Sequence, residues 1–145
     1  MNTNPKYQKN LYGLNFDLRS LVKLYEKNML SNKILLSGPK GIGKSTMAYH
    51  FINYIFSKDE DHSYNLNGFL ISPENKSYKL IENQSHPNLF SIDLLDEKKS
   101  IEISQIREMI KYANKSSFNN KPRFVLIDNV ENLNINSLNA LLKIV

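Results

Sequence analysis

The chain has 145 residues, and 41% of them are hydrophobic. It is long enough to bury one core but too short for two ordinary domains. Its apolar residues come in short runs, so we expect no helix that crosses a bilayer. We also expect no secretory signal in the polar first residues, and the lack of cysteine excludes disulfides and cysteine-based zinc or redox chemistry. A cytoplasmic location is therefore expected.

The net charge leaves two interpretations open. It is +5, with an isoelectric point near 9.3. Lysine and arginine that neutralise phosphates release counterions and favour nucleic-acid binding. The lysines are scattered along the whole chain, however, often near asparagine, which is typical of a solvated surface. We favour the solvated surface over a dedicated basic patch.

The first part of the chain predicts two helices and a strand. Apolar residues between Asp17 and Leu30 recur at spacings of three and four, which predicts a helix. Ile34–Ser37 is an apolar run that ends at a glycine, as expected of a strand buried on both faces of a parallel sheet. From Lys44 onward the helical spacing returns. The apolar stripe of this second helix is Met47, Ala48, Phe51, Ile52 and Ile55.

The middle of the chain carries weaker patterns. Residues 57–67 are polar and acidic, so we expect an exposed and mobile loop. Gly68–Ile71 is a candidate for a short strand, and alternating apolar residues over 89–95 predict a further strand. Ser104 is the predicted N-cap of a following helix. The apolar positions of that helix are Ile103, Ile106, Ile110 and Ala113.

The last part predicts a buried strand and a helix. Phe124–Ile127 is fully apolar and closes on Asp128, which places a carboxylate at the end of the strand. The helix begins near residues 134–136. Its apolar residues are Leu138, Leu141, Leu142 and Val145. Since the chain stops inside this helix, we expect that a larger protein is truncated on its C-terminal side.

The order of these elements predicts the fold class. Alternating strands and helices indicate an α/β domain over residues 1–145, with a parallel sheet and helices on both faces. In such sheets ligands bind beyond the carboxyl ends of the strands. The glycine-rich turn after residue 37 and Asp128 both follow predicted strands, so we expect one site to use both.

The turn itself matches the phosphate-binding pattern G-x-x-x-x-G-K-[ST], the P-loop of nucleoside triphosphatases. The predicted nucleotide-binding residues are Gly38, Pro39, Lys40, Gly41, Ile42, Gly43, Lys44, Ser45 and Thr46. The glycines let successive backbone N–H groups converge on phosphate oxygens. Lys44 is expected to reach the β- and γ-phosphates, Ser45 to bind Mg²⁺, and Thr46 to approach the α-phosphate. The alternative is an ordinary turn between a strand and a helix.

Asp128 is the predicted second half of the metal site. An acid at the end of a neighbouring strand can hold Mg²⁺ through a water molecule, as the Walker-B aspartate of P-loop proteins does. The alternative is a residue that caps a helix or forms a turn. With a P-loop in the same chain, we favour the metal role, in which Ser45 and Asp128 share the cation.

Several stretches together resemble the delta-prime subunits of bacterial DNA polymerase III. They are Leu11–Gly13, Leu36–Lys44, His86–Asn88, Ile103–Arg107, Leu126–Asn134 and Asn139–Lys143. The resemblance extends over nearly the whole chain. It implies an AAA+ ATPase with a RecA-like P-loop fold, whose sensor, lid and collar regions are absent from these 145 residues. It also implies a role in the clamp loader, with gamma/tau and delta subunits, the sliding clamp and primed DNA as partners.

Two departures bear on the role. Gamma/tau subunits share the Asn139–Lys143 stretch but usually carry a four-cysteine zinc module, and this chain has no cysteine, which favours the delta-prime sibling. In AAA+ proteins that hydrolyse ATP, a glutamate follows the Walker-B aspartate, whereas Asn129 follows Asp128 here. Because an amide cannot act as a general base, we expect ATP or ADP binding with Mg²⁺ and weak or no hydrolysis.

Two alternatives to this role remain open from the sequence. One is a free-standing P-loop kinase or NTPase, although nothing between Ser57 and Pro87 resembles a substrate lid. The other is a scaffold with a vestigial loop, which Asn129 favours and the intact Lys44 and Ser45 oppose. By resemblance, Tyr12 and Gly13 line the adenine pocket; otherwise they pack against the first helix. Arg107 faces a subunit interface or solvent.

Overall fold

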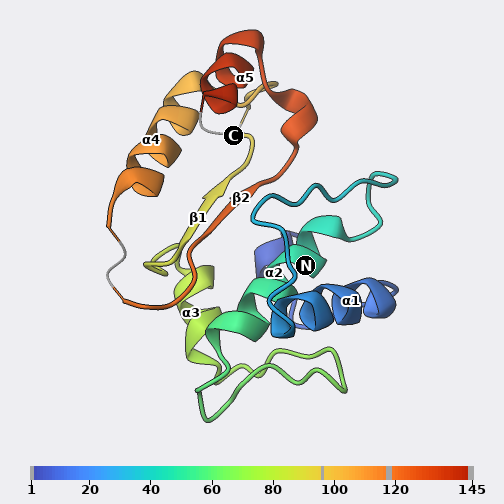
Figure 1. Ribbon diagram of the computed structural model, residues 1–145. Coiled ribbons are helices and arrows are strands. Elements are labelled where there is room, and N and C mark those ends of the chain that lie inside the picture. Colours follow the sequence, from blue (N-terminus) through green and yellow to red (C-terminus); the bar gives the residue numbers. More distant parts are fainter. Residues whose placement is uncertain (1, 96, 117–118, 144–145) are drawn as a thin grey trace. The chain divides into compact units, whose positions relative to one another are not determined.

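The computed structural model describes residues 2–95, 97–116 and 119–143, and it divides the chain into two compact units (Figure 1). The N-terminal unit is Met1–Ser85 and the C-terminal unit is His86–Val145. Val145, which was predicted to belong to the last helix, lies outside the described residues. In the part of the chain that is described, every helix is too short or too polar to cross a lipid bilayer.

The N-terminal unit is helical and is organised around α2. Its elements are η1 (Pro5–Tyr7), α1 (Asn15–Glu26), α2 (Lys44–Phe56) and α3 (Lys76–Glu82). Helix α2 contacts each of the others, which is why most of its side chains are buried. All five residues of its predicted apolar stripe lie in the core, so both the helix and its inward face are confirmed. Helix α1 is confirmed as well, with Leu18 and Val22 buried.

The C-terminal half of α2 carries a buried polar network. Asn53 and Asn75 are 1% and 0% exposed, and their amides bond to each other at 2.9 and 3.2 Å. Asn75 also caps α3 by accepting from the N–H of Tyr78. Ser57 accepts from the N–H of Tyr64, and both residues are buried. The predicted loop 57–67 is therefore anchored to the core at both of these residues.

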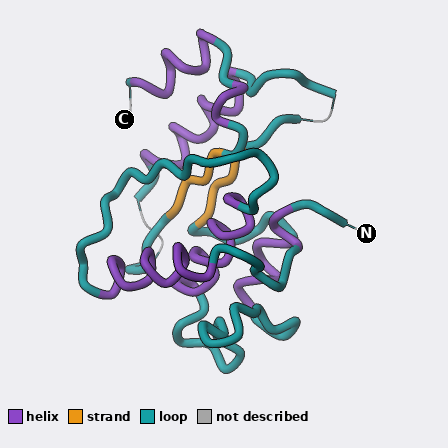
Figure 2. The backbone as a smooth tube through the Cα atoms, turned by 90° about the vertical axis from the view of Figure 1, so that its right-hand side faces the viewer, coloured by secondary structure: helices purple, strands orange, loops and turns teal. Residues whose placement is uncertain are grey.

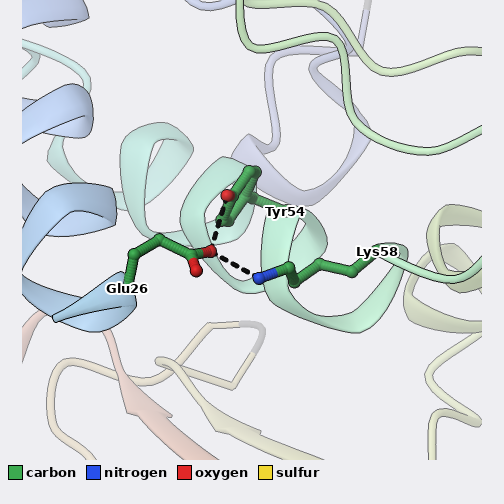
Figure 3. A network of polar contacts seen from close by, with 3 residues as sticks. All are labelled: Glu26, Tyr54 and Lys58. Atoms are coloured by element: carbon green, nitrogen blue, oxygen red, sulfur yellow. Dashed lines mark hydrogen bonds and ion pairs between the residues drawn. The ribbon is translucent and has the colours of Figure 1, made fainter. Parts of the chain in front are cut away.

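A second polar contact ties the ends of α1 and α2 together (Figure 3). Tyr54 and Lys58 both donate hydrogen bonds to the same oxygen, Oε1 of Glu26. The bond from Lys58 is the largest cause that lowers the pKa of Glu26. The Lys58 ammonium also lies over the rings of Tyr25 and Tyr54, at 5.7 and 5.6 Å from their centroids. Because the side chains of Lys58 and Glu26 are 40% and 42% exposed, water screens their charges, and the contact mainly fixes how the two helix ends meet.

The C-terminal unit is a small α/β structure. Its elements are β1 (Leu89–Ile92), α4 (Ile103–Asn114), β2 (Phe124–Ile127), η2 (Val130–Asn132) and α5 (Ile135–Leu142). Strands β1 and β2 run side by side (Figures 1 and 2). They are parallel and in register, with Leu89 beside Phe124 and Ile92 beside Ile127. The parallel arrangement expected from the order of elements is thus confirmed for these two strands.

Helix α4 packs against β1 and α5 and closes the core of this unit. The core consists of Ile92, Ile101, Ile106 and Met109, each at most 2% exposed. Strand β2 was expected to be buried on both faces, but Val125 is 40% exposed. The expected complete burial of β2 is therefore wrong.

The predicted strand Ile34–Ser37 is wrong: the structure gives this segment no regular secondary structure. Ile34 and Leu35 are 46% and 78% exposed instead of buried. A strand requires a neighbour for its backbone N–H and C=O groups, and no described strand pairs with this segment. Its apolar composition alone is not sufficient to form one.

Three further details differ from the sequence predictions. Helix α4 is capped by Glu102 and not by Ser104, because Gln105 Oε1 accepts the N–H of Glu102 at 3.0 Å. Gly68–Ile71 forms only isolated bridges through Leu70. Helix α3 was not predicted at all, since seven residues hold too few apolar positions to show a period.

Candidate phosphate-binding loop and strand-end acids

The glycine-rich loop opens helix α2 as the sequence predicts. The helix starts at Lys44, and Gly43 is its N-cap with φ +101°. Gly41 also has a positive φ, +83°. Side chains are strained at such angles, so these two glycines shape the turn. Beyond the turn, Lys44, Ser45 and Thr46 occupy the first helical positions.

The first turn of α2 has the chemistry of an anion site. Backbone N–H groups in the first turn of a helix have no acceptor within the helix, and the positive end of its dipole lies there. Lys44, Ser45 and Thr46 are half-buried, whereas the loop from Gly38 to Ile42 is exposed. Lys44, Ser45 and Thr46, three of the residues that were predicted to contact phosphate or Mg²⁺, therefore lie together at an accessible helix start.

The Lys44 side chain folds back over the loop. Its Nζ donates to the backbone oxygens of Gly38 at 2.8 Å and Pro39 at 2.9 Å. The N–H of Ile42 also bonds to Pro39 O, at a longer 3.4 Å. The ammonium is thus held by neutral carbonyls inside the bend, which sets a positive charge at the centre of the loop.

The segment before α1 contacts this loop. Leu14, the N-cap residue of α1, places its Cδ1 3.7 Å from where a Cβ on Gly43 would lie. Close by in the sequence, Tyr12 and Phe16 are 80% and 82% exposed. Tyr12 was predicted either to line an adenine pocket or to pack on the first helix. Its high exposure argues against simple packing.

Two carboxylates follow the two parallel strands of the C-terminal unit. Asp128 comes directly after β2, and its N–H donates to the carbonyl of Ile92 at 2.8 Å. Asp93 comes directly after β1. The register that pairs Ile92 with Ile127 brings these acids to neighbouring positions at the carboxyl edge of the sheet. Asp128 is half-buried and Asp93 is exposed.

Asn129 connects the two acids. Its backbone N–H donates to Asp128 Oδ1 at 2.8 Å, while its side-chain Nδ2 donates to Asp93 Oδ1. Asn129 has φ +53°, in the left-handed region that asparagine tolerates better than most residues. Asp93 Oδ1 also accepts the N–H of Leu94 at 2.7 Å. One residue thus holds an oxygen of each carboxylate.

Sequence reasoning did not single out Asp93. The available signal was that Asp93 follows an apolar alternation just as Asp128 follows an apolar run. If the two strands are parallel neighbours, acids that follow both of them must meet. The bond from Gln105 Nε2 to the carbonyl of Asp93, 2.7 Å long, ties this edge to the first turn of α4.

The described residues contain no group of three or more histidines, cysteines or acids that could hold a metal by themselves. A nucleotide-bound Mg²⁺ needs fewer protein ligands, because phosphate oxygens and waters supply the others. Ser45 and Asp128 suit that role as a hydroxyl and a carboxylate. The shared cation stays a prediction.

Two stretches quoted for the family resemblance lie against each other. Arg107, at the end of the Ile103–Arg107 stretch, and Lys143, at the end of Asn139–Lys143, line one open groove between α4 and α5. The groove has a volume of about 290 Å³. Arg107 is exposed and faces this groove, so residues that are distant in the sequence form one surface of the C-terminal unit.

Comparison with known proteins identifies the family. The family described as DNA polymerase III, delta subunit, matches residues 15–145. A relative named DNA polymerase III subunit delta', from Pseudomonas aeruginosa PAO1, is 28% identical over 109 residues. That alignment covers 75% of this chain and 31% of the relative, so the chain spans about a third of the relative's length. The chain belongs to the DNA polymerase III delta-subunit family, and the resemblance to delta-prime subunits is confirmed.

Proposed function

We propose that the chain is the ATP-binding module of a clamp-loader subunit of DNA polymerase III. In this role it binds ATP or ADP with Mg²⁺ and supports the loading of the sliding clamp on primed DNA. Its partners are the gamma/tau and delta subunits, and through them the clamp and DNA. Family membership supports the replication role and favours it over a free-standing kinase.

One observation supports nucleotide binding most directly: the complete phosphate-binding pattern lies at the start of α2, and Lys44 is folded over its bend. Lys44 would exchange its carbonyl partners for β- and γ-phosphate oxygens. The hydroxyl of Ser45 would bind Mg²⁺, and Asp128 would hold the same cation through water. When bound, Mg²⁺ would neutralise part of the phosphate charge.

The same site is proposed to hydrolyse ATP weakly or not at all. Asn129 stands where a glutamate would orient or deprotonate the attacking water, and its amide is already bonded to Asp93. Glu131 is exposed in η2, two residues further on, and serves better as a local partner than as a base. Binding without turnover suits a subunit that acts on its neighbours.

Ligand-dependent stability tests the nucleotide assignment. MgATP or MgADP at about a hundred times its Kd should stabilise the protein by roughly 2.7 kcal/mol and raise Tm. Lys44→Ala should abolish this shift, whereas Lys33→Ala, which removes an exposed lysine outside the loop, should retain it. A flat wild-type melting curve, or an undiminished shift in Lys44→Ala, would favour a scaffold with a vestigial loop.

Steady-state turnover tests the second part. The protein alone should release negligible phosphate from MgATP, because no described group is placed as the base. A rate at or above about 1 s⁻¹, within the ordinary enzyme range, would contradict a non-hydrolysing role. Lys44→Ala provides the background rate.

A further inference from the structure

Hydrogen bonds connect Asp93, Asn129 and Asp128 at the carboxyl ends of β1 and β2. Asn129 lacks the carboxylate of a catalytic glutamate. In the structure it contributes two donors, each to a different acid. We infer that Asn129 is a positioning residue that, braced by Asp93, holds the Asp128 carboxylate ready for a nucleotide-bound Mg²⁺. This inference rests on the proposed nucleotide-binding function.

The Asp128 carboxylate is oriented by its neighbour in the sequence. Its Oδ1 accepts the backbone N–H of Asn129 at 2.8 Å, and this N–H belongs to the peptide group that joins the two residues. Asn129 itself has a left-handed backbone, with φ +53°. A left-handed residue other than glycine needs support from its surroundings. A contact that holds Asn129 in place therefore also holds the N–H that Asp128 accepts.

A side-chain hydrogen bond holds Asn129 in place. Its Nδ2 bonds to Asp93 Oδ1, across the two strand ends. Asp93 is itself fixed by the N–H of Leu94 and by Gln105, which bonds to its carbonyl. Gln105 belongs to α4, whose next residue, Ile106, is fully buried in the core. The support for Asp128 thus runs from a buried helix through Asp93 to Asn129.

This support affects how Asp128 can serve a metal site. A carboxylate that is held in one orientation loses little conformational freedom when it binds a cation or its water shell. Groups that orient such a ligand affect metal affinity without touching the metal. Asp93 and Asn129 therefore act on Mg²⁺ through Asp128, and a carboxamide at 129 adds no negative charge to the edge.

Matched variants separate the contributions. Asn129→Gly keeps a left-handed backbone and the N–H to Asp128 but removes the bond to Asp93. Asp93→Ala removes the same bond from the other side. Asp93→Asn retains an oxygen that can accept it, and so serves as the conservative rescue. Asp128→Asn removes the carboxylate itself and gives the largest loss of binding with which the other variants are compared.

The experiment is a titration of the intact protein with ADP, with and without Mg²⁺, followed by calorimetry. Asn129→Gly and Asp93→Ala should each weaken the Mg²⁺-dependent part of binding about three- to tenfold, as expected for one hydrogen bond. The double variant should lose no more than either single variant, because both remove one contact. Asp93→Asn should bind like the wild type, and ADP without Mg²⁺ should bind all variants equally.

The outcomes are distinguishable. A wild type that binds no nucleotide overturns the proposed function and this inference with it. Mg²⁺-dependent binding in the wild type that is unchanged in both single variants overturns the inference alone. Equal losses with and without Mg²⁺ also overturn it, because they indicate general damage to the fold and not an effect on the cation.

Discussion

Single residues of the N-terminal unit are held by specific donors and acceptors. His50 is fully buried on α2, between the hydroxyl of Tyr64 at 2.8 Å and the carbonyl of Gln8 at 2.9 Å. A carbonyl only accepts, so Nε2 must carry the proton, and Nδ1 must accept from Tyr64. Both ring nitrogens are satisfied in the neutral imidazole. Burial is the main cause that lowers the pKa of His50.

This environment predicts a pH dependence. Above the unfolded pKa of about 6.5, His50 is neutral in both states and contributes no dependence. As pH falls below that value, the unfolded chain takes up a proton that the folded state resists, so the free energy of unfolding decreases, by at most about 1.4 kcal/mol per pH unit. Urea denaturation at pH 7.5 and 5.5 measures it.

The variant His50→Gln should be less stable but should lose this part of the pH dependence. His62→Gln is the control, because His62 is exposed and should leave the dependence intact. If His50→Gln shows the same loss of stability at low pH as the wild type, the source lies in other groups.

Gly43 is a second residue whose role follows from its backbone. Gly43→Ala should lower stability by about 1 kcal/mol or more, because φ +101° is unfavourable for alanine. Space is not the cause, since a Cβ would lie 3.7 Å from Leu14. Thermal melts compare it with Ile42→Ala, which changes an exposed neighbour without a positive φ. Equal effects of the two changes would contradict a backbone origin.

The residues of the candidate site were predictable to different degrees. The loop was found because its pattern is local, and each member has a separate chemical task. The hydrogen bond from Asn129 to Asp93 was not predicted, because it depends on the pairing of β1 with β2 and on the left-handed φ of Asn129. Neither property is visible in the spacing of residues along the chain.

At the scale of elements, prediction succeeded where a period extends over several turns. Helices α1, α2 and α4 and strands β1 and β2 were expected close to their observed positions. The prediction of a strand at Ile34–Ser37 failed because a strand depends on a pairing partner as well as on its composition. The prediction of the α4 cap failed because Ser104 and Glu102 both lie close to the start of the apolar pattern. Only the hydrogen bonds in the structure show which of the two is the N-cap.

The core of the C-terminal unit gives a prediction for α4. Ile106 is fully buried against Ile92, Ile101 and Met109. Ile106→Ala should lower the free energy of unfolding by about 2–5 kcal/mol, through lost burial and the cavity that remains. Chemical denaturation of the purified variant measures this loss.

Ser104→Ala is the matched control on the same helix. Ser104 is exposed and is not the N-cap, so the change should stay within about 0.5 kcal/mol. Losing a true N-cap would cost about 1 kcal/mol. A loss of that size in Ser104→Ala would contradict the assignment of the cap to Glu102.

At the scale of the whole molecule, hydrogen exchange tests whether Asp128 takes part in the proposed Mg²⁺ site. If Ser45 and Asp128 share Mg²⁺, MgADP should slow hydrogen exchange around Gly41–Lys44 and also around Asp128 and Asn129. Hydrogen-exchange mass spectrometry measures both regions in one experiment. ADP without Mg²⁺ should protect the loop alone. Protection that stays confined to the loop when Mg²⁺ is present would remove Asp128 from the site.

The contacts of Lys44 have a consequence for selectivity. Its ammonium already rests on two neutral carbonyls, so any ligand must compete with the protein for this group. Anionic oxygens are stronger hydrogen-bond acceptors than neutral ones, so only a negatively charged ligand would form stronger bonds to Lys44 than the two carbonyls do. An uncharged molecule of similar shape would break the bonds of Lys44 to these carbonyls and replace them with bonds that are no stronger. If the loop binds phosphate as proposed, this exchange would select ligands by their charge.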